Sequence, residues 1–473
     1  MTNLLSPNTQ LAVGKMILLF LILSPSAWSG VLIRWSNTEP PSANSLGVSD
    51  IVLTWKDGIA PLVATARKQG YRVFVEMQIE QARAAAGEAA KLGCTGIIVD
   101  ATESESSKTE NDVASLRSTY PKLGFRVLNA NAKQPDMRGS LIVKRNSILE
   151  VSSPTAQPWI DTNLALIKVE QCSRHAQIPL YTFSWDDQTL QRTFTADDYS
   201  LAVAEAGAFH ADLLLQLDEH LQQGLNSHDA DAWALWNQVH SSLKFSLNTT
   251  DALRPAANVA VVVNHLDTSD EVLNLLGRHN IPFRVFLAAD LKSEDLKGID
   301  VLVVFAKPDK EIGEKIRDFS TRGATVVVVD AHDRYSWQNS QPVQVNEHTT
   351  SYTVGSGKVL ELSEPVTDPE TFAQDIRRLL GKRNSLLSLW NGLTTIVVPY
   401  QGRGGSVSLL EFVNYAKEPV RVQVQVKGSF KTVRYESPDH QCCESLVPVQ
   451  HDGFTEFVIP ELRIAGRIHL ESH

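Results

Sequence analysis

Residues 72–100, RVFVEMQIEQARAAAGEAAKLGCTGIIVD, contain the pattern that decides the fold of this chain. A short apolar run, 72–76, is followed by an Ala- and Glu-rich segment, 79–92, and then by a second apolar run that ends at Asp100. Apolar runs of this length, rich in β-branched residues, are typical of parallel strands that are covered on both faces. Gly93 suits the position that follows a helix C-terminus. The stretch therefore predicts a strand–helix–strand unit.

The same alternation extends in both directions from this unit. The apolar runs that we assign as strands are 31–35, 51–55, 72–76, 95–100, 125–129, 148–151, 178–183 and 211–216. Eight such units match the size range of a (β/α)8 barrel, so residues 30–250 are predicted to form a TIM barrel that carries the catalytic site. A further apolar run at 141–144 leaves the identity of the sixth strand open.

Two smaller domains are predicted after the barrel. Residues 256–382 alternate between apolar strands, such as 259–263 and 301–305, and amphipathic helices, such as 311–322. This alternation is typical of a flavodoxin-like, doubly wound α/β domain. Residues 386–473 instead contain strands of alternating polarity joined by short polar turns, which predicts a C-terminal antiparallel β-sandwich.

The N-terminal segment, residues 1–29, has the pattern of a secretory signal peptide. Lys15 precedes the apolar run 16–23, and the small residues Ala27 and Ser29 fit a cleavage site. We expect an exported protein, periplasmic or extracellular, whose signal is removed; an uncleaved N-terminal anchor is the alternative. Because the apolar run is far shorter than the roughly 20 residues that span a bilayer, we expect no membrane span after cleavage.

The composition limits the classes of partner. Of the 473 residues, 43% are hydrophobic and 21% are charged, as in a globular protein, and the net charge is −10. Phosphate binding needs a concentrated basic face, and the sequence has no long run of Lys or Arg. We therefore expect no nucleic-acid partner.

No cofactor or metal site is expected from the motifs. Asn264 and His265, rather than a glycine-rich phosphate loop, follow the first strand of the second domain, and the chain has no HExxH motif and no CxxC pair. The four cysteines are predicted to be unpaired core residues with at most one bridge. Adjacent Cys442 and Cys443 are not expected to bridge each other, because so short a loop strains the bond geometry.

Acidic residues at strand ends are the candidates for catalysis, because barrel enzymes carry their reactive groups at the carboxyl ends of the strands. Hydrolysis of a glycosidic bond needs one carboxyl group that protonates the leaving oxygen and one that acts as nucleophile or base. We assign the nucleophile or base to Asp100 and the proton donor to Asp186 or Glu76. The structural alternatives are a helix cap for Asp100, a solvated loop for Asp186 and a salt bridge in the barrel mouth for Glu76.

Residues near these acids are the candidates for substrate binding, because sugar faces stack on aromatic rings and sugar hydroxyls bond to planar polar groups. The candidates are Trp35, Trp55, Glu103, Gln157, Trp159, Asp161 and Trp185. The tryptophans that end strands could equally belong to the core or the barrel rim. The loop that carries Gln157 could equally form the capped start of a helix at 164–170.

The order of the three domains resembles that of the β-galactosidases that carry a trimerisation domain and of related glycoside-hydrolase-like proteins. The segment LEFVNYAKEPV, 410–420, is similar to the opening of their C-terminal sandwich. The resemblance implies a glycoside hydrolase with a carbohydrate substrate and no cofactor. It also implies a second domain with a structural or assembly role, through which a homo-oligomer could form.

One departure from this family keeps a rival interpretation open. The Asn-Glu pair that ends the fourth strand in the large clan of retaining glycosidases is absent, and the strand ends VDATE, 99–103, instead. The rival is a non-catalytic protein, in which a degenerate glycosidase barrel binds carbohydrate or takes part in cell-envelope assembly.

Overall fold

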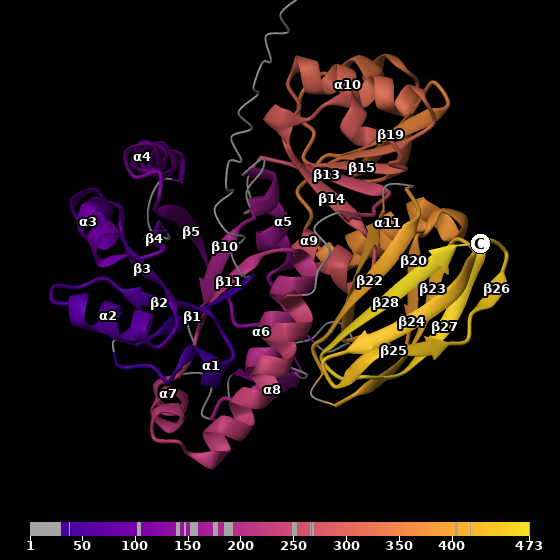
Figure 1. Ribbon diagram of the computed structural model, residues 1–473. Helices are drawn as coiled ribbons and strands as arrows, with labels where there is room; N and C mark the ends of the chain where they lie inside the picture. Colours follow the sequence, from indigo (N-terminus) through magenta and orange to yellow (C-terminus); the bar gives the residue numbers. More distant parts are fainter. Residues whose placement is uncertain are drawn as a thin grey trace, which may run out of the picture.

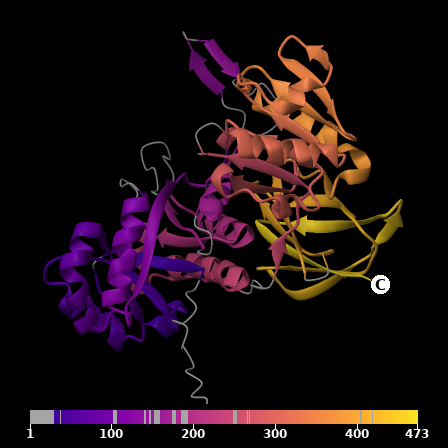
Figure 2. The ribbon, with the colours of Figure 1, turned by 90° about the horizontal axis from the view of Figure 1, so that it is seen from above.

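The computed structural model describes residues 30–472 except for the short segments 37, 102–105, 139–141, 146–147, 152–158, 174–177, 184–192, 248–252, 265, 267–268, 403–404 and 417. The predicted signal peptide therefore lies outside the described residues. The barrel lies on one side of the molecule, and the second unit and the sandwich lie together on the other (Figures 1 and 2). In the described part of the chain, no helix combines the length and apolar character needed to cross a membrane.

The first unit is a closed barrel of parallel strands. Its order around the barrel is β1-β11-β10-β5-β4-β3-β2, and β1 pairs with both β2 and β11. The strands are β1 (Val31–Trp35), β2 (Asp50–Thr54), β3 (Arg72–Gln78), β4 (Gly96–Asp100), β5 (Gly124–Ala132), β10 (Leu180–Phe183) and β11 (Asp212–Gln216). The predicted parallel barrel is thus present.

The expected count of eight barrel strands is wrong for the described residues, because seven strands close the barrel. The predicted sixth strand is β8 (Ile148–Val151), which pairs antiparallel with β7 (Ile142–Arg145) in a separate hairpin. Only two residues separate β7 from β8. Such a short connection permits a hairpin but not the crossover of a dozen residues that a parallel pair needs. β5 therefore pairs directly with β10.

Helices cover the outer face of the barrel. The helices α2, α3 and α4 lie on the side away from the other units, and α6 and α8 lie between the barrel and the sandwich (Figure 1). Gly93 has a φ of 74°, so it ends α3 in the left-handed conformation that the sequence predicts. The helices are α1 (Ala43–Leu46), α2 (Ala60–Lys68), α3 (Ile79–Leu92), α4 (Ser106–Thr119), α5 (Leu164–Ser173), α6 (Ala196–Phe209), α7 (Glu219–Asn226) and α8 (Ala230–Leu247).

The barrel interior is built in layers. One apolar side chain from each strand forms a buried cluster at mid-height: Leu32, Val52, Phe74, Ile98, Leu128, Leu180 and Leu214. Two residues earlier along the strands, towards their amino ends, Asp50 accepts two hydrogen bonds of 2.6 Å from Arg72, and Arg126 pairs with Asp212. Because side chains alternate across a strand, the residues two positions later also point inward. These residues form the carboxyl-terminal rim of the barrel.

The second unit has the predicted flavodoxin-like sheet. The order β14-β13-β15-β16-β19 is parallel, and it corresponds to the order 2-1-3-4-5 of that fold. Two antiparallel strands, β18 and β17, extend it beyond the predicted elements. The strands are β13 (Val259–Val263), β14 (Phe283–Leu287), β15 (Val301–Val304), β16 (Thr325–Val328), β17 (Pro342–Asn346), β18 (Thr349–Val354) and β19 (Gly357–Leu362), and the α-helices are α9 (Asp270–Arg278), α10 (Lys310–Thr321) and α11 (Pro369–Asn384).

The third unit is the predicted antiparallel sandwich. Its six-stranded sheet contains β12 (Arg254–Pro255), β21 (Thr395–Gln401), β22 (Val407–Asn414), β28 (Ala465–Ser472), β24 (Phe430–Ser437) and β25 (His440–Leu446). Its four-stranded sheet contains β20 (Leu387–Trp390), β23 (Val420–Lys427), β27 (Phe454–Leu462) and β26 (Val449–His451). Side chains such as Phe412, Val424 and Ile468 form the core between the sheets.

A buried polar network joins the sandwich to the barrel. The hydroxyl of Tyr415, just after β22, donates to Glu205 on α6 over 2.7 Å. Glu205 is fully buried and also accepts hydrogen bonds from the Thr162 hydroxyl at 2.7 Å and the backbone nitrogen of Asn163 at 2.9 Å. The hydroxyl of Tyr400 on β21 donates to the carbonyl of Ala208 over 2.7 Å. These contacts fix the sandwich against the barrel helices.

Candidate active site

Polar side chains gather where the barrel strands end. They line a cavity of about 400 Å³ at the carboxyl-terminal rim, the end at which barrel enzymes carry their active sites. Most of the residues follow the apolar interior layer by two positions, and they come from five strands, β1, β2, β3, β4 and β11. The polar lining residues on the strands are Arg34, Thr54, Glu76, Gln78, Asp100 and Gln216.

Glu76 lies at the base of this cavity and is clamped by Arg34. Arg34 donates to Glu76 through Nε at 2.8 Å and through Nη2 at 2.5 Å, so both carboxylate oxygens accept from one guanidinium group. Arg34 also donates through Nη1 to Gln216 Oε1 at 3.1 Å. Burial raises the pKa of Glu76, and the charge of Asp100 raises it further, while Arg34 lowers it. The net direction is upward.

Asp100 lies beside Glu76 at the more open side of the same cavity. It is half-buried, and its Oδ2 accepts a hydrogen bond of 3.0 Å from Gln78 Nε2. Gln78 and Asp100 are register partners on adjacent strands, so β3 and β4 position them together. The structure therefore brings two of the predicted catalytic residues, Asp100 and Glu76, into one cavity and gives them different surroundings.

The structure does not bring two of the predicted tryptophans to this cavity. Trp35 is 0% exposed, because its position on β1 points away from the barrel interior and into the core under the helices. Its indole nitrogen donates to the Thr38 hydroxyl over 3.2 Å. Trp55 follows β2, is half-buried and packs against the same core.

Trp159 and Asp161 lie on β9 (Trp159–Asp161), a short strand that pairs with β6 (Asp136–Arg138). The Trp159 indole donates to Asp161 Oδ1 over 3.0 Å, and the guanidinium carbon of Arg278 on α9 lies 5.2 Å from the Trp159 ring centroid. These residues therefore lie at the border with the second unit. The remaining candidates, Glu103, Gln157, Trp185 and Asp186, lie outside the described residues.

Most polar residues of the cavity are not among those that the sequence predicts. Arg34, Thr54, Gln78 and Gln216 line it together with the two acids. A signal was available in the strands, because each residue that follows a buried apolar residue by two positions points to the same side. In β1, this rule places Arg34 on the side of Leu32.

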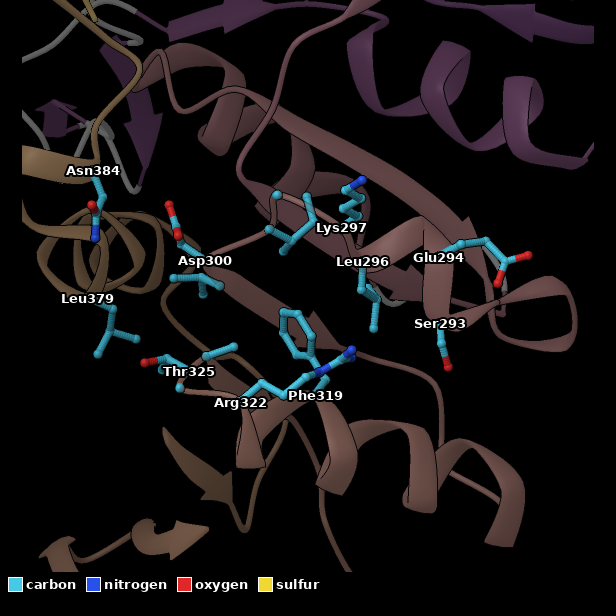
Figure 3. Close-up of a pocket in the computed structure, with 15 residues that line it drawn as sticks. Ser293, Glu294, Leu296, Lys297, Asp300, Phe319, Arg322, Thr325, Leu379 and Asn384 are labelled. Atoms are coloured by element: carbon cyan, nitrogen blue, oxygen red, sulfur yellow. The ribbon is translucent and has the colours of Figure 1, made fainter. Parts of the chain in front are cut away.

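A second cavity, of about 720 Å³, lies in the flavodoxin-like unit (Figure 3). Asp300 and Thr325, which lie at the amino ends of β15 and β16, line it together with Arg322. Doubly wound sheets bind nucleotides at the opposite edge, beyond the carboxyl ends of the strands. The position of this cavity therefore does not match a nucleotide site of that kind.

One group of side chains of metal-binding type is found among the described residues, at Glu436, Cys442 and Cys443 of the sandwich. The structure places the sulfur atoms of these adjacent cysteines against each other, so the pair does not present two separate thiolate ligands. Cys94 and Cys172 have free thiols, as the sequence predicts.

Comparisons with known proteins give a likeness in fold. No family model matches the chain, and no curated protein matches its sequence. α-L-Fucosidase isoenzyme 2 from Paenibacillus thiaminolyticus superposes with a TM-score of 0.56 at 12% identity, over 94% of this chain and 100% of that chain. A β-galactosidase from the haloarchaeon Halorubrum lacusprofundi superposes with a TM-score of 0.54 at 8% identity, over 94% of this chain and 99% of that chain.

A third structure, the cold-adapted β-galactosidase from Rahnella sp. R3, has a TM-score of 0.51 at 10% identity and covers 89% of this chain and 95% of its own. The matches extend over nearly the whole length of these proteins. The chain therefore has the multi-domain fold of glycoside hydrolases, with a closed parallel barrel followed by further sheets, as the resemblance in its sequence implied.

Proposed function

We propose that this protein is an exported glycoside hydrolase whose reaction takes place in the rim cavity. The observation that carries the proposal is the convergence of Glu76 and Asp100 at the carboxyl ends of adjacent strands. The shared fold with glycosidases supports it, and the signal-like residues 1–29 support export. The substrate class is carbohydrate.

The two acids suit the two roles that glycosidic cleavage requires. Burial raises the pKa of Glu76, which favours the protonated form that a general acid needs. Glu76 gives its proton to the leaving oxygen as the glycosidic bond breaks. Asp100 either attacks the anomeric carbon or takes a proton from the water that does so.

Arg34 sets a condition on this mechanism. Both oxygens of Glu76 accept hydrogen bonds from Arg34, and such bonds favour the ionised carboxylate. Glu76 can act as proton donor only after the entering substrate displaces one of them. Asp186 is the alternative donor, because it follows the carboxyl end of β10 in sequence, and that strand ends at the same rim.

Substitution of each acid tests the proposal. We expect Asp100→Asn and Glu76→Gln to lower kcat on chromogenic glycosides by about 100-fold or more, the contribution typical of a positioned acid or base. Glu88→Gln, which removes an exposed carboxylate on α3, is the matched control and keeps full turnover. Turnover that is unchanged in Asp100→Asn would reject the assignment of that residue.

The Arg34 clamp also favours a second candidate function. The ion pair with Arg34 holds Glu76 as a carboxylate, and a barrel that binds sugar without cleaving it has no need of a proton donor at this position. Purified protein that binds glycans in an array, yet hydrolyses none of the same glycans, would establish this non-catalytic function. Assembly of the cell envelope is a further role that this second candidate could serve.

We also propose that the second unit joins copies of the chain into a homo-oligomer. Among the described strands, β17 is at one edge of the sheet, where Val343 and Val345 are 59% and 57% exposed. An open apolar edge strand is a site for pairing with another chain. Sedimentation velocity would detect the oligomer, and Val343→Lys with Val345→Lys is expected to dissociate it.

A further inference from the structure

A cleft of about 1310 Å³ separates α11 from the outer face of the four-stranded sheet of the sandwich. The helix supplies one wall, and residues of β20, β23 and β27 supply the other. Pockets for single small molecules typically occupy about 300–1,000 Å³, so this cleft has room for a longer ligand. The barrel rim residues do not take part in it.

The sheet side of the cleft carries an exposed aromatic residue. Along β20, Leu387 and Leu389 point into the sandwich core, while Ser388 and Trp390 point outward. Trp390 is 44% exposed, and Phe454 on β27 lies in the same lining. The exposed ring of Trp390 provides a flat apolar surface on which a ligand can stack. A ligand that covers this ring removes its apolar face from water, which favours binding.

The charge of the cleft opposes the charge of the chain. Five Lys and Arg side chains line it, against a single acid, Asp452, although the net charge of the chain is −10. Asp452 lies 3.2 Å from His451. The basic lining residues are Arg377, Arg378, Lys382, Arg383 and Lys427.

Part of this positive charge is not neutralised by the protein. Arg378 pairs with Asp375 at 2.7 Å, and Arg377 donates to the carbonyls of His279 and Asn280. No acidic partner contacts the other three basic side chains in the part of the chain that the structure describes. All three are exposed: Lys382, Arg383 and Lys427.

We propose that this cleft binds a segment of an anionic polysaccharide, one that bears carboxylate or sulfate groups. A sugar ring stacks on Trp390, and the anionic groups lie near Lys382, Arg383 and Lys427. Stacking accounts for the exposed ring, and the uncompensated cations favour a charged chain over a neutral one. The inference goes beyond the proposed hydrolase and does not depend on Glu76 or Asp100.

Calorimetric titration of the full chain with polygalacturonate and with chondroitin sulfate tests this site, with dextran as the neutral probe. We expect the anionic polymers to bind, dextran to bind at least about tenfold more weakly, and added salt to weaken the binding of the anionic polymers. Trp390→Ala is expected to lower the affinity at least about tenfold, whereas Trp390→Phe keeps most of it. The double variant Lys382→Gln, Arg383→Gln is expected to lower both the affinity and its salt dependence.

Matched controls separate this site from general charge effects and from the barrel. Lys68→Gln with Lys91→Gln removes two exposed cations from α2 and α3 and keeps the wild-type affinity. Glu76→Gln also binds as the wild type does, so loss of hydrolysis and loss of this binding are separable. The proposal is overturned if neither anionic polymer binds, if the cleft variants bind as the wild type does, or if single-stranded DNA binds more tightly than both polysaccharides.

Discussion

Arg34 holds both carboxylate oxygens of Glu76, through Nε at 2.8 Å and Nη2 at 2.5 Å, inside the cavity that also contains Asp100. The pair joins β1 to β3 across β2, because Arg34 lies on β1 and Glu76 on β3. It therefore contributes to barrel closure, and it also controls whether Glu76 can carry a proton. Stability and chemistry are coupled at this one contact.

We expect Arg34→Gln to lower the free energy of unfolding by about 3 kcal/mol near neutral pH, because it leaves a buried carboxylate without its cation. Without Arg34, the pKa of Glu76 rises further, so the loss becomes smaller as the pH falls and Glu76 takes up a proton. Urea denaturation at several pH values measures both effects. The double variant Arg34→Gln, Glu76→Gln should lose less stability than Arg34→Gln alone, and an equal or larger loss would contradict the buried-charge argument.

We expect Asp100→Asn to lower the pKa of Glu76. The charge of Asp100 is one of the causes that raise this pKa, and the substitution removes that charge without removing the side chain. Carboxyl resonances followed by NMR over a pH titration report the pKa directly, without any need for turnover. Glu88→Gln, which changes a distant exposed acid, should leave the Glu76 titration where it is in the wild type. If the pKa of Glu76 is the same in Asp100→Asn as in Glu88→Gln, the charge of Asp100 does not act on Glu76.

Acid conditions should destabilise the fold through His210. Burial lowers the pKa of His210 to about 4, and the charges of Lys168 and Arg467 act in the same direction. At pH values between the lowered pKa and the ordinary pKa of histidine, the unfolded chain therefore binds more protons than the folded chain. The free energy of unfolding consequently falls as the pH drops through this range. We expect the contribution of His210 to be on the order of 2 kcal/mol.

The substitution His210→Asn tests this pH dependence. His210 has a φ of 55°, and asparagine tolerates the left-handed region better than most residues. The variant should show a flatter decline of Tm between neutral pH and pH 4. His228→Asn is the matched control, because His228 also has a positive φ, 60°, but is exposed. A decline as steep as in the wild type would exclude His210 as its source.

Loss of the Tyr415 hydroxyl should weaken the contact between the sandwich and the barrel. Tyr415→Phe removes one hydrogen bond from the fully buried Glu205, at an expected cost of about 1–3 kcal/mol. Thermal unfolding followed by calorimetry measures the change. Tyr120→Phe, at a half-buried position on the barrel, serves as the control and should shift the Tm little. If both variants unfold at the same temperature, the network does not stabilise the junction.

The two acids of the candidate site could be predicted, because a residue that ends a parallel strand is recognisable from the strand alone. Glu76 and Asp100 end apolar runs, and the structure places both at the barrel rim. Trp35 also ends such a run but is fully buried on the other side of its strand. Side chains alternate between the two faces of a strand, so the position along the strand decides whether a residue points into the barrel or towards the helices. The alternation predicts the direction only when one inward-facing residue of that strand is known.

Local sequence patterns specify the order of the three units, the helix end at Gly93 and the presence of acids at the strand ends, because periodicity and capping act between residues close in the chain. Long-range contacts instead set the closure of the barrel by seven strands among the described residues, the clamp of Arg34 on Glu76 and the gathering of cations near Trp390. These features depend on pairing between segments far apart in the chain. Register and packing against the whole core set that pairing, and no local pattern encodes it.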